Sequence, residues 1–337
     1  MNKFIPYGQQ WIDDKDVDSV VSILKSDWLT TGPKVKEFEK KFADYVKSKY
    51  AVAVSSGTAA LHTAAFAAGI SKGDEAITTA MTFAASANCV LYLNGKPVFA
   101  DIDKETYNID PKEIENKITK KTKALIPVDY TGQPCDIDNI NKIAENHDLV
   151  VIEDSSHAVG ATYKGKKVGS LSDLSIFSFH PVKHITTGEG GMITTNSKEM
   201  YEKLLLFRSH GQTKNPKKFV TSNEGDWFYE QQELGFNYRI TDLLCALGIS
   251  QLEKIDDFIF RRKQIVNKYN EAFNENDNIV IPTQKDNVES SWHLYVIQLN
   301  LENLKVNRKK IFNELRLKNI GVHVHYIPVY FHPYYQK

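Results

Sequence analysis

The residues best suited to chemistry lie in the segment S-I-F-S-F-H-P-V-K-H-I-T-T-G-E-G-G, residues 175–191. An apolar, β-prone run over 174–179 precedes Pro181, which removes a backbone donor and turns the chain out of a strand. The turn presents Lys183 at the mouth of the predicted sheet, with Ser178 just before it. A lone lysine in a turn is ordinarily a solvated surface charge. Its assignment to chemistry therefore depends on its partners.

One partner is a carboxylate at the end of the preceding predicted strand. V-V-I-E-D, residues 150–154, is an apolar run that ends in Asp154. A carboxylate is costly to bury unless it meets a cation. A protonated pyridine nitrogen is such a cation, and at about 3 Å and an effective dielectric of about 20 the pair gains roughly 5 kcal/mol before desolvation. The alternative is that Asp154 caps the start of a helix.

A second partner is a candidate phosphate site. S-S-G-T-A-A-L, residues 55–61, is predicted to end a strand and begin an Ala-rich helix. Gly57 lets an anion approach the backbone, and we expect the amides of Thr58 and Ala59 to be free at the positive end of the helix dipole. An ordinary capped helix start is the alternative, and the spacing of a P-loop is absent.

The phosphate site, the carboxylate and the lysine together meet the needs of one cofactor. Pyridoxal phosphate requires an anchor for its phosphate, a partner for its ring nitrogen and an amine for covalent attachment. It also needs a residue against the ring face, for which Phe83 and His157 are candidates.

Alternating elements place these side chains together. Apolar runs separated by helical patterns are typical of βαβ units and of a mostly parallel sheet, which binds ligands beyond the carboxyl ends of its strands. The predicted strands are 51–55, 76–79, 97–100, 124–128, 150–153, 174–178 and 192–195. The predicted helices include 14–26, 58–69, 83–93, 111–118 and 137–147.

The last third of the chain has a different pattern. Apolar residues at helical spacing predict one long helix over 241–269, which leads into a smaller α+β domain. We expect a large domain over 1–245 and the smaller one over 246–337. The smaller domain is predicted to contain a strand at 292–299, a helix at 307–317 and a strand at 321–327.

Composition excludes several kinds of partner. The 337 residues contain 42 Lys and Arg and 42 Asp and Glu, so bulk electrostatic binding to nucleic acid or anionic membrane is not expected. The N-terminus lacks a signal-peptide core, and the Ala-rich run 59–68 is too short to span a bilayer. Cys89, Cys135 and Cys245 lack the spacing of a metal site or disulfide frame and favour a cytoplasmic protein without a metal.

Six motifs carry a resemblance to a known family. In chain order they are S-S-G-T-A-A-L, M-T-F-A-A-S-A-N, E-D-S-S-H-A-V-G-A, F-S-F-H-P-V-K, T-G-E-G-G and G-F-N-Y-R-I-T-D. They resemble the nucleotide-sugar aminotransferases of the DegT/StrS type, from Gln9 to the chain end. These are pyridoxal-phosphate enzymes of fold type I, the aspartate-aminotransferase fold. The resemblance implies α/β architecture, with a mostly parallel seven-stranded sheet and a smaller α+β C-terminal domain.

Three further segments, 224–239, 290–295 and 321–335, resemble the subgroup that works in pseudaminic acid biosynthesis. The implied reaction moves an amino group from L-glutamate to a UDP-linked 4-keto-6-deoxy-N-acetylhexose. The cofactor alternates between pyridoxal and pyridoxamine phosphate. Aromatic side chains for base stacking and basic side chains for a diphosphate, among them Arg208, would suit such a substrate.

The resemblance also implies roles for matched residues. Lys183 would attach the cofactor covalently, and Asp154 would pair with its ring nitrogen. Thr58 and Ser178 would bind the phosphate, in a cradle shaped by Gly57.

Other matched positions concern the ring face, the subunit partner and the substrate. Phe83 takes the ring-packing position. Asn237 would reach the phosphate of the neighbouring subunit's cofactor, so a homodimer is the expected functional unit. Arg239, Tyr326 and His325 are candidates for contact with the sugar nucleotide.

The chain departs from the family pattern twice. His184 directly follows the lysine, where the resemblance leads us to expect a proline, and its role is not assigned. The sequence also stops at Lys337, short of the C-terminal segment usual in the family, so we expect the smaller domain to be incomplete.

Three alternatives stay open at this stage. A sugar 3-dehydratase of the same fold is disfavoured because Lys183 is present and the cysteines lack cluster spacing. An aminotransferase for another nucleotide-linked keto-deoxysugar, carrying the amine at C3 or C4 on UDP or dTDP, is a closer alternative. A non-catalytic regulator built on the same fold is the third.

Overall fold

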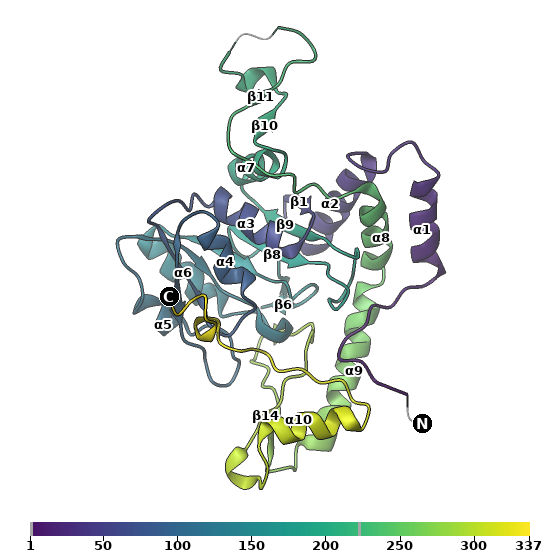
Figure 1. The fold of residues 1–337 in the computed structure, drawn as a ribbon, viewed down its shortest axis with the longest axis vertical. Helices are drawn as coiled ribbons and strands as arrows, with labels where there is room; N and C mark the ends of the chain where they lie inside the picture. Colours follow the sequence, from purple (N-terminus) through teal and green to yellow (C-terminus); the bar gives the residue numbers. More distant parts are fainter. Residues whose placement is uncertain (1–2, 222–223) are drawn as a thin grey trace.

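A computed structural model describes residues 3–221 and 224–337 (Figure 1). The central sheet consists of β1 (Tyr50–Val54), β2 (Glu75–Thr79), β3 (Lys96–Ala100), β4 (Thr122–Ile126), β5 (Val150–Asp154), β8 (Leu174–Ser178) and β9 (Gly191–Thr195). Their order is β1-β9-β8-β5-β4-β2-β3. Only β9 runs antiparallel to its neighbours. The prediction of a mostly parallel seven-stranded sheet is confirmed.

Helices cover both faces of this sheet (Figure 1). They are α1 (Asp14–Leu24), α2 (Pro33–Val46), α3 (Gly57–Ala67), α4 (Ala85–Leu91), α5 (Pro111–Glu115), α6 (Ile137–His147) and α7 (Lys198–Arg208). On one face, Phe38 and Phe42 of α2 pack against Phe177 and Phe179 at the end of β8, all fully buried. On the other face the Ala-rich α3 lies close to β8 and β9, because small side chains allow a close approach.

Short elements complete the body of the molecule. A three-stranded sheet contains β6 (Thr162–Tyr163), β7 (Lys166–Lys167) and β13 (Val288–Glu289). Single-turn helices are η1 (Tyr130–Gly132), η2 (Pro216–Lys218), η3 (Leu301–Asn303) and η4 (Val329–Phe331). In residues 3–221 and 224–337 we find no helix with the length and apolar content required to cross a membrane.

The single long helix predicted over 241–269 is wrong. The structure has two helices, α8 (Asp242–Leu252) and α9 (Ile255–Phe273), and Lys254 stands between them. At the break, the amine of Lys254 lies 2.7 Å from Asp16 of α1 and 2.9 Å from Asp13, the N-cap of that helix. The helical spacing of apolar residues continues across the break, so the sequence pattern does not reveal where one helix ends and the next begins.

Helix α9 leads to a lower lobe that holds α10 (Arg308–Leu317) and the pair β12 (Ile279–Val280) and β14 (Gln298–Leu299) (Figure 1). The predicted helix at 307–317 is confirmed. The predicted strand at 292–299 is reduced to its last two residues, and 321–327 is not a strand. In the part of the chain that the structure describes, neither 292–297 nor 321–327 pairs with a strand, and the bridge between Ile5 and Ile320 lies just before the second segment.

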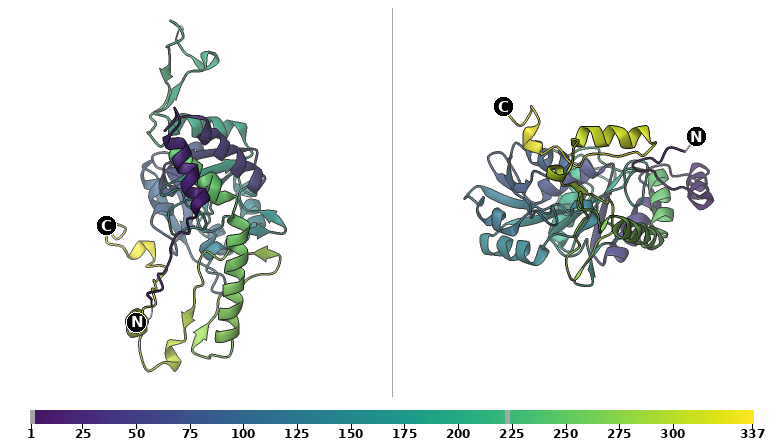
Figure 2. Two further views of the ribbon diagram at one scale, coloured as in Figure 1. Left: turned by 90° about the vertical axis from the view of Figure 1, so that its right-hand side faces the viewer. Right: turned by 90° about the horizontal axis from the view of Figure 1, so that it is seen from below.

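The last residues return from the lower lobe to the body of the molecule (Figure 2). Val329 donates its backbone N–H to the carbonyl of Ala80, at 3.0 Å. The hydroxyl of Tyr335 donates to Asn88 of α4, at 2.6 Å. The C-terminal segment therefore contacts the turn after β2 and the helix that follows it.

An arm projects from the opposite end of the molecule (Figure 1). Its base is the pair β10 (Gln212–Thr213) and β11 (Glu230–Gln231). Trp227, near its tip, is 74% exposed. An apolar ring exposed to this degree suits contact with another protein surface.

The start of α2 depends on one buried carboxylate of α8. Asp242 is fully buried, and its two oxygens accept the backbone N–H groups of Gly32 and Lys34 at 2.7 and 2.8 Å. We expect Asp242→Ala to lower the free energy of unfolding by about 2–3 kcal/mol, because two buried donors lose their acceptor. Urea denaturation measures this change, provided that the dependence of the unfolding free energy on urea concentration is the same in both proteins. The control Asp44→Ala breaks the exposed ion pair with Lys40, and we expect it to lower the free energy of unfolding by less than about 0.5 kcal/mol. Equal midpoints for the two variants would refute the expectation.

Candidate active site

Lys183 lies on a loop closed tightly at its base, between β8 and β9. Phe179 donates its N–H to the carbonyl of Gly190 and accepts the N–H of Thr187, at 2.9 and 3.1 Å. Lys183 itself donates its backbone N–H to the carbonyl of His180, at 2.8 Å. Gly190 must be glycine, because a Cβ there would lie 2.2 Å from Oγ1 of Thr187. The T-G-E-G-G sequence thus fixes the base from which the lysine projects.

Two opposing effects act on the pKa of the Lys183 amine: burial and the charge of a neighbouring carboxylate. Burial lowers the pKa of Lys183 to about 8, and the negative charge of Asp154 acts in the opposite direction. Burial disfavours the ammonium form, so a lysine in this position has a usable fraction of neutral amine near neutral pH. The neutral form is the one that attacks a carbonyl carbon.

Asp154 ends β5 and is 5% exposed. Its Oδ2 accepts the hydroxyl of Ser86 at 2.6 Å, and its Oδ1 accepts the N–H of Ser156 at 3.2 Å. No helix begins after it, so the alternative interpretation as a helix cap is wrong. In the described part of the chain no lysine, arginine or histidine lies within salt-bridge distance of Asp154. A buried carboxylate without a direct cation fits a site for a protonated ring nitrogen.

The predicted phosphate site lies at the N-terminus of α3, beside the end of β8. A Cβ on Gly57 would lie 2.8 Å from Cβ of Ser178, so only glycine brings the helix this close to that serine. The expectation of a free amide on Ala59 is wrong, because that N–H donates to Oγ of Ser56 at 3.0 Å. This cap leaves the amides of Gly57 and Thr58, with the Ser178 hydroxyl, to meet an anion at the positive end of the helix.

Three histidines near Lys183 form a buried cluster that the sequence analysis only partly anticipated. The ring centroids of His157 and His293 are 4.4 Å apart, and those of His293 and His184 are 5.3 Å apart. Nε2 of His184 lies 3.0 Å from the carbonyl oxygen of Ser291. Burial lowers the pKa of all three histidines well below the usual value. His184, which the sequence left unassigned, joins the lysine loop to the segment that carries His293.

The candidates Tyr326 and His325 lie on the wall facing this cluster. The hydroxyl of Tyr326 is 3.4 Å from Nε2 of His157. Nε2 of His325 is 2.8 Å from the hydroxyl of Tyr7. Burial, followed by the charges of His323 and Lys183, lowers the pKa of His325 to about 4. Tyr7 was missed because an isolated tyrosine near the N-terminus carries no sequence signal.

Other predicted residues lie apart from the lysine. Phe83 is 64% exposed in the turn after β2, and Asn237 is exposed on the strand-like segment that bridges to Ser209. Arg239 lines a cleft of about 730 Å³ between α2 and α7.

Arg208 lines the same cleft as Arg239, and its contact with a diphosphate stays a prediction, although its Nη1 is already engaged. It pairs with Glu39 at 2.5 Å and donates to the carbonyl of Ala53.

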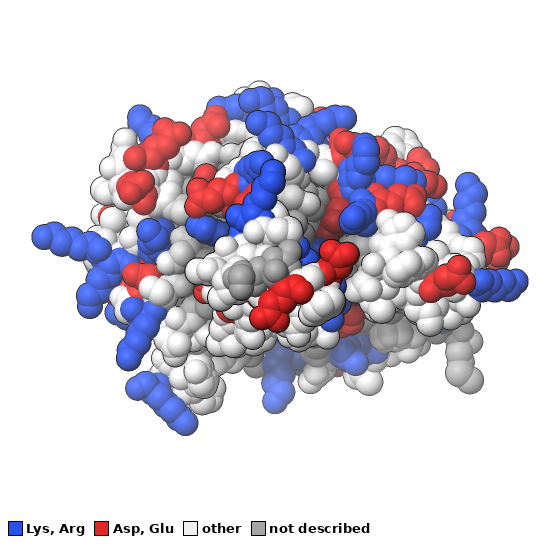
Figure 3. All heavy atoms as spheres, turned by 90° about the horizontal axis from the view of Figure 1, so that it is seen from above, with Lys and Arg blue, Asp and Glu red and all other residues white. Residues whose placement is uncertain are grey.

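Charge on the face that bears the arm shows no large region of one sign. Figure 3 shows lysine and arginine side chains interspersed with aspartate and glutamate across this face. The described residues contain no group of three or more histidine, cysteine, aspartate or glutamate side chains arranged to hold a metal ion.

The sheet order, the helices on both faces and a lysine at the carboxyl edge match the fold type I architecture of pyridoxal-phosphate enzymes. Comparison with known proteins makes this assignment specific. The chain belongs to the DegT/DnrJ/EryC1/StrS aminotransferase family, whose model matches residues 10–337. It is therefore a pyridoxal-phosphate-dependent sugar aminotransferase.

Individual relatives extend over almost the whole chain. A Campylobacter jejuni protein named UDP-4-amino-4,6-dideoxy-N-acetyl-beta-L-altrosamine transaminase is 43% identical over 99% of this chain and 86% of its own length. The structure of Helicobacter pylori PseC, an aminotransferase of pseudaminic acid biosynthesis, superposes with a TM-score of 0.91. That superposition has 34% identity and covers 99% of this chain and 88% of PseC.

A third relative bears on the cofactor. Spr1654 of Streptococcus pneumoniae has been solved in a pyridoxal-phosphate form and a pyridoxamine-phosphate form. The latter superposes with a TM-score of 0.90 at 34% identity, over 98% of this chain and 88% of that one.

Proposed function

We propose that this chain transfers an amino group from L-glutamate to a UDP-linked 4-keto-6-deoxy-N-acetylhexose. The product is a 4-amino-4,6-dideoxy sugar nucleotide, an intermediate of pseudaminic acid biosynthesis. The observation that carries the proposal is the 43% identity to the Campylobacter jejuni transaminase over 99% of the chain. The likeness to PseC, an aminotransferase of the same pathway, supports it.

The residues at the sheet edge fit the cofactor. When bound, pyridoxal phosphate supplies a carbonyl carbon for an amine and a ring that withdraws electrons. Asp154 would hold the positive charge of the ring nitrogen, and its burial strengthens that pairing. The amides of Gly57 and Thr58 and the hydroxyl of Ser178 would bind the phosphate, and His157 would contact the ring.

Lys183 has two tasks in this proposal. Its neutral amine would hold the cofactor, and Nζ would be free for proton transfer once an amino donor is bound. The free Nζ would then take the proton from the α-carbon of the donor. With the keto sugar Nζ would move a proton in the opposite sense, so one amine would serve both half-reactions.

A second copy of the chain completes the site in our proposal. Asn237 is exposed, and in a homodimer it would reach the phosphate of the partner's cofactor. The exposed Phe83 would pack against the ring in the assembled site. Arg239, Tyr326 and His325 would contact the sugar nucleotide. Three free, buried cysteines suit a protein of the reducing cytoplasm.

A substrate panel tests the proposal. The enzyme is first converted to its pyridoxamine form with L-glutamate and freed of that donor. It is then mixed with UDP- and dTDP-linked 4-keto-6-deoxy sugars and with one 3-keto isomer, and the absorbance of the pyridoxal form is followed. We expect recovery that is at least about tenfold faster with the UDP-linked 4-keto-N-acetyl sugar, a difference of about 1.4 kcal/mol. Faster recovery with another sugar would assign the alternative substrate. No recovery with any sugar would refute the transferase assignment.

The acidity of Lys183 can be measured in protein freed of cofactor. Because burial lowers the pKa of Lys183 to about 8, its reaction with trinitrobenzenesulfonate should rise through pH 8. An ordinary lysine reacts with a midpoint near about 10.4. Asp154→Asn removes the charge that favours the ammonium form, so the midpoint should move lower still. Mass spectrometry of the peptide containing Lys183 follows the reaction, and a midpoint near 10 in the unaltered protein would contradict the expectation.

A further inference from the structure

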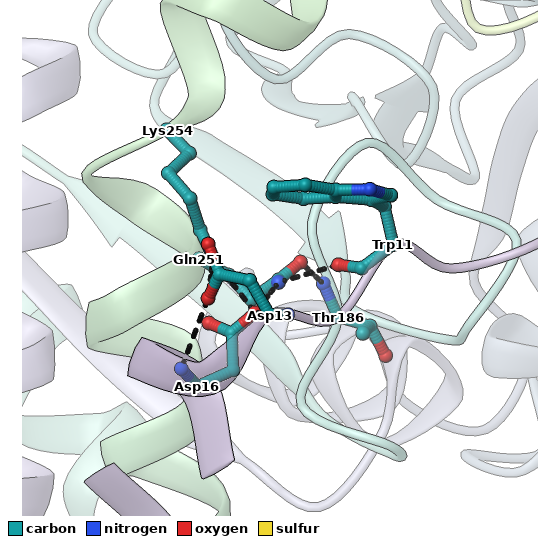
Figure 4. A network of polar contacts seen from close by, with 6 residues as sticks. All are labelled: Trp11, Asp13, Asp16, Thr186, Gln251 and Lys254. Atoms are coloured by element: carbon teal, nitrogen blue, oxygen red, sulfur yellow. Dashed lines mark hydrogen bonds and ion pairs between the residues drawn. The ribbon is translucent and has the colours of Figure 1, made fainter. Parts of the chain in front are cut away.

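The loop that carries Lys183 has a second attachment, to Gln251 near the end of α8 (Figure 4). The backbone N–H of Thr186, three residues after the lysine, donates to Oε1 of Gln251 at 3.4 Å. Both residues are buried, and Gln251 is 1% exposed. The hydroxyl of Thr186 in turn bonds to the carbonyl of Phe179 and accepts the N–H of Gly188. Thr186 therefore connects the base of the loop to α8.

The other end of the Gln251 amide holds the N-terminal segment. Its Nε2 donates to the carbonyl of Trp11 at 2.9 Å and to Oδ2 of Asp16 at 2.7 Å. A backbone N–H can only donate, and carbonyl and carboxylate oxygens can only accept. The three partners thus fix which end of the amide carries oxygen and which carries nitrogen.

One lysine holds the two carboxylates at the start of α1. Asp16 is fully buried, and Nζ of Lys254 lies 2.7 Å from its Oδ2 and 2.9 Å from Oδ1 of Asp13. Nζ of Lys254 also lies 5.1 Å from the centroid of the Trp11 ring (Figure 4). A buried ion pair of this kind fixes geometry more than it adds stability.

The same N-terminal segment reaches the other walls of the site. The hydroxyl of Tyr7 contacts His325, and a Cβ on Gly8 would lie 3.4 Å from Cβ of Val182, the residue before Lys183. Residues 7–16 thus run from the wall of Tyr326 and His325, past the lysine turn, to Gln251. Each contact on this path can transmit a displacement to the lysine.

We propose that Gln251 is a positioning residue, which holds the Lys183 loop against residues 7–16 so that Nζ of Lys183 stays aligned for proton transfer. The inference rests on the proposed role of Lys183. Without the Gln251 amide, the buried N–H of Thr186 has no acceptor and the loop shifts to find one. A displacement of about 1 Å at a reacting group costs up to about 100-fold in rate.

The first test replaces Gln251 with methionine, which has a similar volume and no amide. We expect the Thr186 amide to exchange its hydrogen at least about tenfold faster, a readout that needs no cofactor. We also expect kcat to fall about 10- to 100-fold while KM for glutamate stays within about threefold. Gln264→Met is the matched control, because Gln264 lies on the exposed side of α9 and bonds only to Arg261.

The second test keeps an acceptor for Thr186 and removes the donor to the N-terminal segment. In Gln251→Glu a carboxylate oxygen still accepts the N–H of Thr186, but the carbonyl of Trp11 and Oδ2 of Asp16 lose the amide donor. We expect the exchange of the Thr186 amide to stay within about threefold of the unaltered protein, while kcat falls about tenfold because the loop is no longer held against residues 7–16. An unchanged kcat in this variant overturns the positioning role.

The outcomes separate the two proposals. Gln251→Met with unchanged Thr186 exchange and unchanged kcat overturns the positioning role. Fast exchange with full kcat overturns it as well, because the link would then be structural only. If Gln251→Met does not fold, Gln251→Glu decides: a lower kcat with slow Thr186 exchange supports the positioning role, and an unchanged kcat overturns it. The role of Lys183 itself is judged by its own variants, so failure of one proposal is visible apart from the other.

Discussion

Lys183→Ala is expected to lower turnover by at least about 10⁴-fold while the protein stays folded and keeps its phosphate anchor. The variant removes the amine placed at the sheet edge near Asp154, which is the group proposed to move the proton in both half-reactions. Lys183→Arg should be equally inactive, because a guanidinium is not deprotonated at any pH the protein tolerates. Steady-state kinetics and the visible absorbance of the purified proteins measure both effects.

The matched control is Lys166→Ala, on the exposed strand β7, which should keep full activity. Cofactor retention distinguishes a chemical defect from a binding defect. We expect Lys183→Ala to bind pyridoxal phosphate non-covalently, so dialysis should release it. Substantial turnover in either lysine variant would refute the assignment of Lys183.

The second large effect is expected for Asp154→Asn, with turnover lower by about 100- to 1,000-fold. An amide of nearly the same shape keeps an acceptor for Ser86 but loses the negative charge. The charge contributes roughly 5 kcal/mol to a ring-nitrogen pair before desolvation is counted. Part of that gain is offset by burial, and the remainder corresponds to the stated range at about 1.4 kcal/mol per tenfold.

Asp173→Asn provides the control for this variant. Asp173 accepts the N–H of Val151 at the other end of β5, at 2.9 Å, so it tests the same strand away from the site. We expect it to change turnover by less than about threefold, since an amide oxygen can accept the same bond. Equal activity of the two variants would mean that the charge of Asp154 does not act on the reaction.

Most of the large sheet was predictable from the sequence, for a clear physical reason. A strand covered on both faces needs a continuous apolar run, and seven such runs match the seven strands within two residues at either end. The lower lobe was less predictable. Its segments over 292–297 and 321–327 have apolar and β-branched residues, but no neighbouring strand pairs with them, and pairing is not encoded locally.

The residues of the site were likewise predictable only in part. Gly57, Asp154, Ser178 and Lys183 lie in motifs where local sequence sets the local geometry, so their convergence at one sheet edge follows from the strand order. His293 reaches the cluster only through tertiary packing.

Two further features arise from contacts between distant parts of the chain. Arg208 was predicted to meet a diphosphate, and its Nη1 pairs with Glu39, which lies 169 positions earlier in the sequence. Lys254, at the break before α9, likewise pairs with Asp13 and Asp16 near the start of the chain. Such pairings are decided by packing between distant elements, which periodicity and motif spacing do not describe.

The return of the C-terminal segment has a mechanical consequence. A lobe joined to a body by one helix behaves as a cantilever and can swing freely about its root. Here the lobe is held at three places: by α9, by β13, which pairs with β6 in the body, and by the contacts of Val329 with Ala80 and Tyr335 with Asn88. Supports at several points resist swinging more than a single root does. A wide opening of the lobe therefore requires the C-terminal contacts to detach first.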